Sequence, residues 1–166
     1  MRKVLLPGSY DPITEGHLAV VRHALAQYDE VHVIVFVNPH KHTLFTLDER
    51  LTLLRVACKE HPRTVLGYDT GMVADYAKAN GIDTLLKGIR DERDLAYEQP
   101  MADYHKARGI DTLFLTAEQG YKDVSSSAVR EALVSGEEIP PHMLTGALRD
   151  AVLSLYEAKK RASAEK

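Results

Sequence analysis

Short apolar runs alternate along the chain with longer segments whose apolar residues recur at helical spacing. The short runs predict buried strands over residues 4–6, 31–37, 64–68, 84–86 and 113–115. The longer segments predict helices over residues 18–28, 46–60, 72–79, 125–134 and about 140–161. A further helix is expected between residues 91 and 107, with a kink or break at Pro100.

Strands and helices in alternation predict βαβ units and a parallel sheet. The expected fold class is α/β: a Rossmann-like, doubly wound sheet of five parallel strands with flanking helices. We expect one domain over residues 1–166, with its core in 1–135 and a polar, frayed tail after the last helix. Ligands of such sheets bind beyond the carboxyl ends of the strands. The segments that matter most are therefore 7–17, 38–45, 69–73, 87–94 and 116–127.

Composition narrows the class of protein. The chain has 166 residues, which fits one domain, and 21 basic against 24 acidic side chains give a net charge of −3. This balance argues against broad nucleic-acid binding. The lone Cys58 excludes an intrachain disulfide and a cysteine zinc site, and we interpret it as a packing residue. With no apolar stretch long enough for a membrane span or a signal core, we predict a cytoplasmic protein without membrane partners.

Several familiar site motifs are missing from the sequence. No glycine precedes a lysine as in a P-loop, and there is neither a G-x-G-x-x-G nor an H-E-x-x-H segment. The run His40-Lys41-His42 lacks the spacing of a helical zinc pair. We therefore predict no metal site built from the protein's own side chains.

The segment after the first strand carries the clearest chemical signal. It reads Gly8-Ser9-Tyr10-Asp11-Pro12 and continues to Thr14-Glu15-Gly16-His17 at the start of a helix. Free N–H groups at a helix start bind anions, and a glycine lets a phosphate approach the backbone. The His17 imidazole could donate to the same anion. The alternative is that the glycines only form turns and His17 is a surface residue.

Four segments together resemble the phosphopantetheine adenylyltransferase family, within the nucleotidyltransferase superfamily that carries a T/H-x-G-H motif. The first is the segment just described, in which the motif reads Thr14-Glu15-Gly16-His17. The other three, in chain order, are 38–50, 87–98 with Lys87-Gly88-Ile89-Arg90, and 124–131 with Ser125-Ser126-Ser127. The four segments occur in the family's order and cover the chain from residue 6 to about 131.

The resemblance implies a reaction that transfers AMP from ATP to 4′-phosphopantetheine, with Mg²⁺, giving dephospho-coenzyme A and pyrophosphate. It also implies a homo-hexamer. By resemblance His17, Lys41 and Arg90 are catalytic: His17 holds the α-phosphate and Lys41 bridges the two reacting phosphates. Ser9 would bind the attacking phosphate, and Lys87 the acceptor's phosphate.

The remaining binding residues are also implied by the resemblance. The acceptor side comprises Ser9, Lys41, Met72, Val73, Lys87, Tyr104 and His105. The nucleotide side comprises Ser9, Tyr10, Gly16, His17, Gly88, Ile89, Arg90, Asp94, Glu98, Tyr121, Lys122, Asp123, Val124, Ser125, Ser126 and Ser127.

Ser9 stands where the family usually has Thr, and three further departures from the family pattern, all on the acceptor side, bear on the identity of the substrate. The family has Arg at the position of Lys87, and Met and Asn at those of Tyr104 and His105. Lysine keeps the charge but loses the planar two-point grip on phosphate. Two alternatives therefore stay open. One is a related nucleotidyltransferase with another acceptor, such as nicotinate or nicotinamide mononucleotide or a cytidylyl acceptor. The other is a nucleotide-binding module without catalysis.

Overall fold

Five parallel strands form one sheet in the order β3-β2-β1-β4-β5. The computed structural model describes residues 1–165. Its strands are β1 (Lys3–Gly8), β2 (Glu30–Phe36), β3 (Thr64–Asp69), β4 (Thr84–Ile89) and β5 (Asp111–Thr116). Its helices are α1 (Glu15–Leu25), α2 (Leu47–Ala57), α3 (Val73–Ala79), α4 (Glu92–Lys106), the 3₁₀ turn η1 (Gln119–Tyr121), α5 (Ser126–Ser135) and α6 (Gly146–Ala164). The predicted Rossmann-like class is confirmed.

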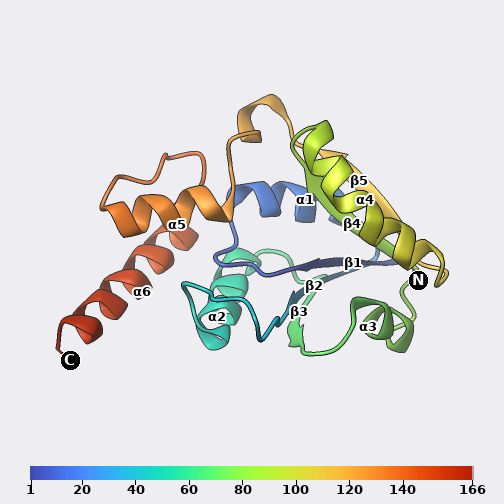
Figure 1. Ribbon diagram of the computed structural model, residues 1–166, viewed down its shortest axis with the longest axis horizontal. Coiled ribbons are helices and arrows are strands. Elements are labelled where there is room, and N and C mark those ends of the chain that lie inside the picture. Colours follow the sequence, from blue (N-terminus) through green and yellow to red (C-terminus); the bar gives the residue numbers. More distant parts are fainter. Residues whose placement is uncertain (166) are drawn as a thin grey trace.

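The strand order places a crevice between β1 and β4. The chain moves outward from β1 to β3 on one side of the sheet, then crosses back and continues from β4 to β5 on the other. Right-handed crossovers in opposite directions put helices on both faces of a sheet. The direction of the crossovers reverses between β1 and β4. The connections that follow these two neighbouring strands therefore lie on opposite faces of the sheet, and a ligand crevice opens between them. Helices α5 and α6 extend away from the sheet beyond the carboxyl ends of the strands (Figure 1).

Alternating side chains of the strands build a core on each face of the sheet. Val4, Leu6, Val33 and Leu86 belong to the larger core, which includes buried residues of α1, α2, α5 and α6. Leu5, Ile34 and Leu85 belong to the smaller core with the inner face of α3. The free Cys58 is buried in the larger core, as expected for a packing residue. Burial on both faces accounts for the unbroken apolar runs in the sequence.

Pro100 does not break its helix, so the prediction of a break there was wrong. Helix α4 runs without interruption from Glu92 to Lys106. Proline removes the hydrogen bond to the carbonyl four residues earlier, here that of Ala96. Both Ala96 and Pro100 lie on the exposed side of the helix, where water can satisfy that carbonyl.

The predicted start of the last helix at residue 140 was also wrong. Helix α6 begins at Gly146, and a turn precedes it, closed by the Met143 N–H on the Pro140 carbonyl at 3.1 Å. The Met143 carbonyl accepts the Glu15 N–H at 2.9 Å and so satisfies a free donor at the start of α1. If this segment were helical, the Met143 carbonyl would accept an N–H of its own helix and could not cap α1. At its other end α6 continues to Ala164, into the segment expected to fray.

Candidate active site

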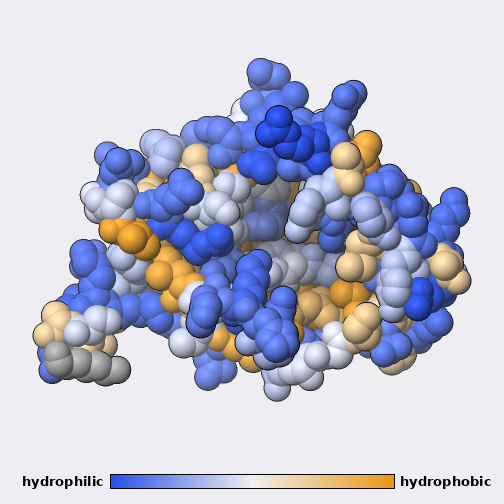
Figure 2. Space-filling view, in the orientation of Figure 1, coloured by the Kyte–Doolittle hydropathy of each residue, from blue (hydrophilic) through white to orange (hydrophobic). Residues whose placement is uncertain are grey.

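A cavity of about 520 Å³ lies at the carboxyl ends of β1 and β4. Its walls come from the loop after β1, the first turns of α1, the start of α4 and the segment leading into α5. The space-filling view is hollowed between α5 and α4, with a mostly polar rim (Figure 2). Fourteen predicted site residues line it: Ser9, Tyr10, Gly16, His17, Lys87, Gly88, Ile89, Arg90, Asp94, Glu98, Tyr121, Val124, Ser125 and Ser126.

Tyr10 fixes the loop that follows β1. Its ring is buried, and its hydroxyl donates to the Leu6 carbonyl at 2.7 Å. Burial raises the pKa of this phenol, so it stays protonated. Gly8 makes room for the ring, because a Cβ there would meet it at 3.0 Å. Tyr10 has a φ of 47°, a left-handed conformation that is uncommon for a bulky residue and is held here by this packing.

His17 is oriented by the start of its own helix. The Thr14 N–H donates to His17 Nδ1 at 3.0 Å, so Nδ1 is an acceptor and the proton resides on Nε2. His17 lines the cavity, and its Nε2–H is free to donate to a ligand. Burial lowers the pKa of His17 to about 4, which leaves the ring neutral near pH 7. The arrangement provides one fixed neutral donor beside the free N–H groups of the α1 N-terminus.

The end of β4 supplies two cations to the cavity, and the first turns of α4 supply two carboxylates. Lys87 Nζ lies 2.7 Å from Glu98 Oε2, and Arg90 Nε lies 3.0 Å from Asp94 Oδ2. The Asp94 carboxylate also accepts the Arg90 backbone N–H at 3.0 Å. Hydrogen bonds from the Arg90 guanidinium lower the pKa of Asp94. Asp94 therefore supports Arg90, and an incoming phosphate has to share or displace these carboxylate partners.

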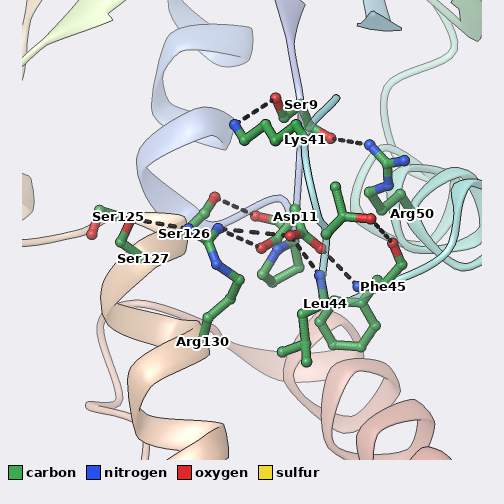
Figure 3. A network of polar contacts seen from close by, with 12 residues as sticks. Ser9, Asp11, Lys41, Leu44, Phe45, Arg50, Ser125, Ser126, Ser127 and Arg130 are labelled. Carbon is green, nitrogen blue, oxygen red and sulfur yellow. Dashed lines mark hydrogen bonds and ion pairs between the residues drawn. The ribbon is translucent and has the colours of Figure 1, made fainter. Parts of the chain in front are cut away.

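Lys41 reaches the cavity through Ser9. Its ammonium group donates to Ser9 Oγ at 3.1 Å, although Lys41 itself is not one of the lining residues. The Ser9 carbonyl in turn accepts from Arg50 Nη1 at 3.0 Å (Figure 3). His17 comes from the first turn of α1, and Lys41 and Arg90 come from two separate loops; all three lie on or beside one cavity.

The start of α5 faces the cavity from the other side. Ser125 caps the helix by accepting the Ala128 N–H at 3.0 Å. Ser126 donates to the Pro12 carbonyl at 2.7 Å, which ties the helix start to the loop after β1. Gly16 allows close packing here, since its missing Cβ would lie 3.3 Å from Val124. The cavity thus has helix N-termini from both α1 and α5, each of which favours an anion.

Eight predicted residues lie outside the lining of this cavity: Lys41, described above, and Met72, Val73, Tyr104, His105, Lys122, Asp123 and Ser127. Tyr104 stacks under the Arg108 guanidinium at 3.5 Å. His105 is buried, and its pKa is lowered by burial and by the charges of Lys87 and Arg108. Asp123 pairs with His142 at 2.9 Å. Their predicted roles on the acceptor or nucleotide side stay predictions.

Sequence reasoning missed several residues that shape the site. Five further residues line the cavity: Thr14, His23, Thr116, Ala117 and Glu118. Of these, only Thr14 belongs to a motif that could have indicated a role in the site. Asp11 and Arg50 are buried with exposures of 3% and 6%, and both hold neighbouring loops. Asp11 stands in the quoted motif, so its position is a signal, whereas Arg50 lies within the predicted helix 46–60 and has no such signal.

Comparison with known proteins identifies the family. The cytidylyltransferase-like family model matches residues 5–132. A phosphopantetheine adenylyltransferase of Corynebacterium diphtheriae is 41% identical over 155 residues, covering 92% of this chain and 97% of that protein. One of Thermobifida fusca is 40% identical over 148 residues, covering 86% and 90%. This chain belongs to the phosphopantetheine adenylyltransferase family.

A solved structure of another protein has the same fold as this adenylyltransferase. A putative nicotinate-nucleotide adenylyltransferase from Vibrio parahaemolyticus superposes with a TM-score of 0.69 at 15% identity, covering 94% of this chain and 96% of that one. Among residues 1–165 of the adenylyltransferase, no three His, Cys, Asp or Glu side chains gather to hold a metal ion. Within the same residues, no helix has the length and apolarity to cross a membrane.

Proposed function

We propose that this chain transfers AMP from ATP to 4′-phosphopantetheine, giving dephospho-coenzyme A and pyrophosphate. An oxygen of the acceptor's phosphate forms a bond to the α-phosphorus of ATP as the bond to the pyrophosphate oxygen breaks. The observation that carries the proposal is the fixed His17 donor, with Lys41 and Arg90 on or beside the same cavity. The relatives of about 40% identity carry the substrate assignment.

The chemistry demands charge stabilisation more than a nucleophile. Both reactants are anions, and transfer of a phosphoryl-type group relies on positioning and on donors aimed at the developing charge. The neutral His17 Nε2–H would donate to an α-phosphate oxygen. Lys41 beside Ser9 would reduce repulsion between the two phosphates, and Arg90 would hold the phosphates of ATP. The α5 N-terminus offers backbone N–H groups to the phosphates that leave.

Mg²⁺ is proposed to enter with ATP and not as a resident ion. Two of the three acidic residues that line the cavity, Asp94 and Glu98, are engaged by Arg90 and Lys87, and the third is Glu118. They leave no cluster of free oxygen ligands for a cation. Mg²⁺ prefers octahedral oxygen ligands and commonly binds through substrate phosphates. The residues present therefore fit a cation that the triphosphate itself carries.

The decisive experiment is a pyrophosphate-release assay with ATP, Mg²⁺ and a panel of phosphorylated acceptors. We expect turnover with 4′-phosphopantetheine and none with nicotinate mononucleotide or with a cytidylyl acceptor and CTP. Turnover with a different acceptor alone would assign the chain to the related activity. ATP binding without turnover on any acceptor would favour a binding module.

Hexameric assembly and cytoplasmic location are also part of the proposal. Exposed apolar side chains on α4 and on the neighbouring edge strand β5, namely Tyr97, Met101 and Leu113, offer surface that further copies would cover. Light scattering coupled to gel filtration tests the assembly. A monomer at micromolar concentration would contradict it.

A further inference from the structure

Asp11 joins the loop after β1 to the loop that carries Lys41. Its carboxylate is 3% exposed and accepts two backbone N–H groups, that of Leu44 at 2.9 Å and that of Phe45 at 2.8 Å. Each carboxylate oxygen thus holds one N–H, as a buried charge requires. The acceptor-side loop is therefore attached to the segment that leads into His17 (Figure 3).

Arg130 joins the same segment to the start of α5. Its Nη1 donates to the Asp11 carbonyl at 2.9 Å, and its Nη2 donates to Ser127 Oγ at 3.1 Å. Nη1 also lies 3.9 Å from the Asp11 carboxylate. Arg130 belongs to the second turn of α5 and is not one of the residues that line the cavity, so we treat it as a residue that positions others.

Both the acceptor side and the nucleotide side of the site are therefore hydrogen-bonded to one dipeptide, Asp11-Pro12. On one side are the loop of Lys41 and its bond to Ser9. On the other side is the α5 start, where Ser126 faces the cavity and bonds to Pro12. An anion bound at the α5 N-terminus would order the helix start and, through Arg130, the segment that holds the acceptor-side loop. The second ligand would then find part of its site already ordered.

We propose that Arg130 is a positioning residue that couples the nucleotide side of the site to the acceptor side. The inference rests on the proposed function, because it takes the α5 start as the site of the triphosphate. Coupling of this kind is reciprocal: each ligand strengthens the binding of the other by the same factor. Without Arg130, each ligand keeps its own contacts but no longer benefits from the other.

The test measures 4′-phosphopantetheine binding by calorimetry, with and without a saturating ATP analogue that has a methylene group between its α and β phosphorus atoms, plus Mg²⁺. The coupling factor is the ratio of the two dissociation constants. We expect at least about 5 for the unaltered protein, within the usual range for coupled sites. Arg130→Met should bring the factor to within about twofold of 1, with each single-ligand constant within about threefold. Arg130→Lys, which can replace only one of the two donors, should give an intermediate factor.

The matched control is Arg161→Met, the same exchange in the last turn of α6. It should keep the coupling factor of the unaltered protein. An unchanged factor in Arg130→Met, or a factor of 1 in the unaltered protein, overturns the coupling. Failure of the unaltered protein to bind 4′-phosphopantetheine, or to release pyrophosphate with it, overturns the proposed function as well, so the two failures are distinct.

Discussion

Replacement of His17 separates its part in the helix start from its part in the reaction. His17 occupies the third position of α1, where its Nδ1 accepts the Thr14 N–H at 3.0 Å. Glutamate and glutamine are the usual acceptors at that position of a helix. His17→Gln therefore keeps the cap and offers an amide donor, His17→Glu keeps the cap but brings a negative charge, and His17→Ala removes both cap and donor.

The expected magnitudes follow from these two roles. Loss of a single donor to a developing oxyanion costs about 10²–10³ in kcat, or roughly 2.7–4 kcal/mol. Loss of the bond to the Thr14 N–H costs about 0.5–1.5 kcal/mol of stability. The expected order of kcat is His, Gln, Ala and Glu, from highest to lowest. In stability, by contrast, the Ala variant should rank lowest, because it alone loses the cap.

The assay is steady-state pyrophosphate release at saturating 4′-phosphopantetheine, with thermal unfolding of each variant measured in parallel. KM for ATP should stay within several-fold, because the donor acts mainly as charge develops. His61→Ala, in a loop outside the cavity, is the control and should retain kcat. If His17→Ala retains kcat within about threefold, or if kcat follows stability across the series, His17 has only a structural role.

Three further predictions concern pH, an ion pair and a buried carboxylate. The folded pKa of His17 is about 4 against an ordinary 6.5, so unfolded chains bind more protons between these values. The free energy of unfolding should therefore fall as pH drops from about 6.5 to 4, and less steeply in His17→Gln; equal slopes in denaturant titrations would contradict this. Glu98→Gln breaks the 2.7 Å pair with Lys87, so kinetics should give a lower KM for the acceptor, by about two- to fivefold, without a lower KM for ATP. Asp11→Ala leaves two backbone N–H groups without acceptors and should lower the free energy of unfolding in urea by at least about 2 kcal/mol; a smaller loss would mean that water replaces the carboxylate.

Local pattern was enough to predict most elements of the fold. Thr46 and Glu49 have the three-residue spacing of a capping box at the start of the predicted helix 46–60, and both of its hydrogen bonds form, at 2.8 and 3.1 Å, because the partners lie within one helical turn. The five strands appear where the apolar runs stand, since a parallel sheet buried on both faces needs such runs. Gly136 ends α5 in a left-handed conformation with φ of 78°, one residue beyond Ser135 and close to the predicted helix end at residue 134.

Errors occurred where distant contacts override local preference. The proline pair at 140–141 favours a helix start, yet the Met143 carbonyl caps α1 instead. The long-range contacts of Asp11, Arg50 and Arg130 cannot be predicted from the sequence, although Asp11 stands in the motif, because each side chain binds backbone atoms of a distant segment. Lys87 and Glu98 are eleven residues apart, and only the packing of α4 against β4 brings them together.

The sequence by itself determined the parallel α/β architecture, the family and the motif residues, because these depend on periodicity and on short segments. Only the tertiary structure decided that His17 donates through Nε2 and that its ring is neutral, since a backbone N–H and burial fix both. It also decided which charges pair and which loops are joined by hydrogen bonds. The charge pairs and loop contacts join residues far apart in the chain, and the neutral state of His17 depends on burial; no one-dimensional pattern encodes either.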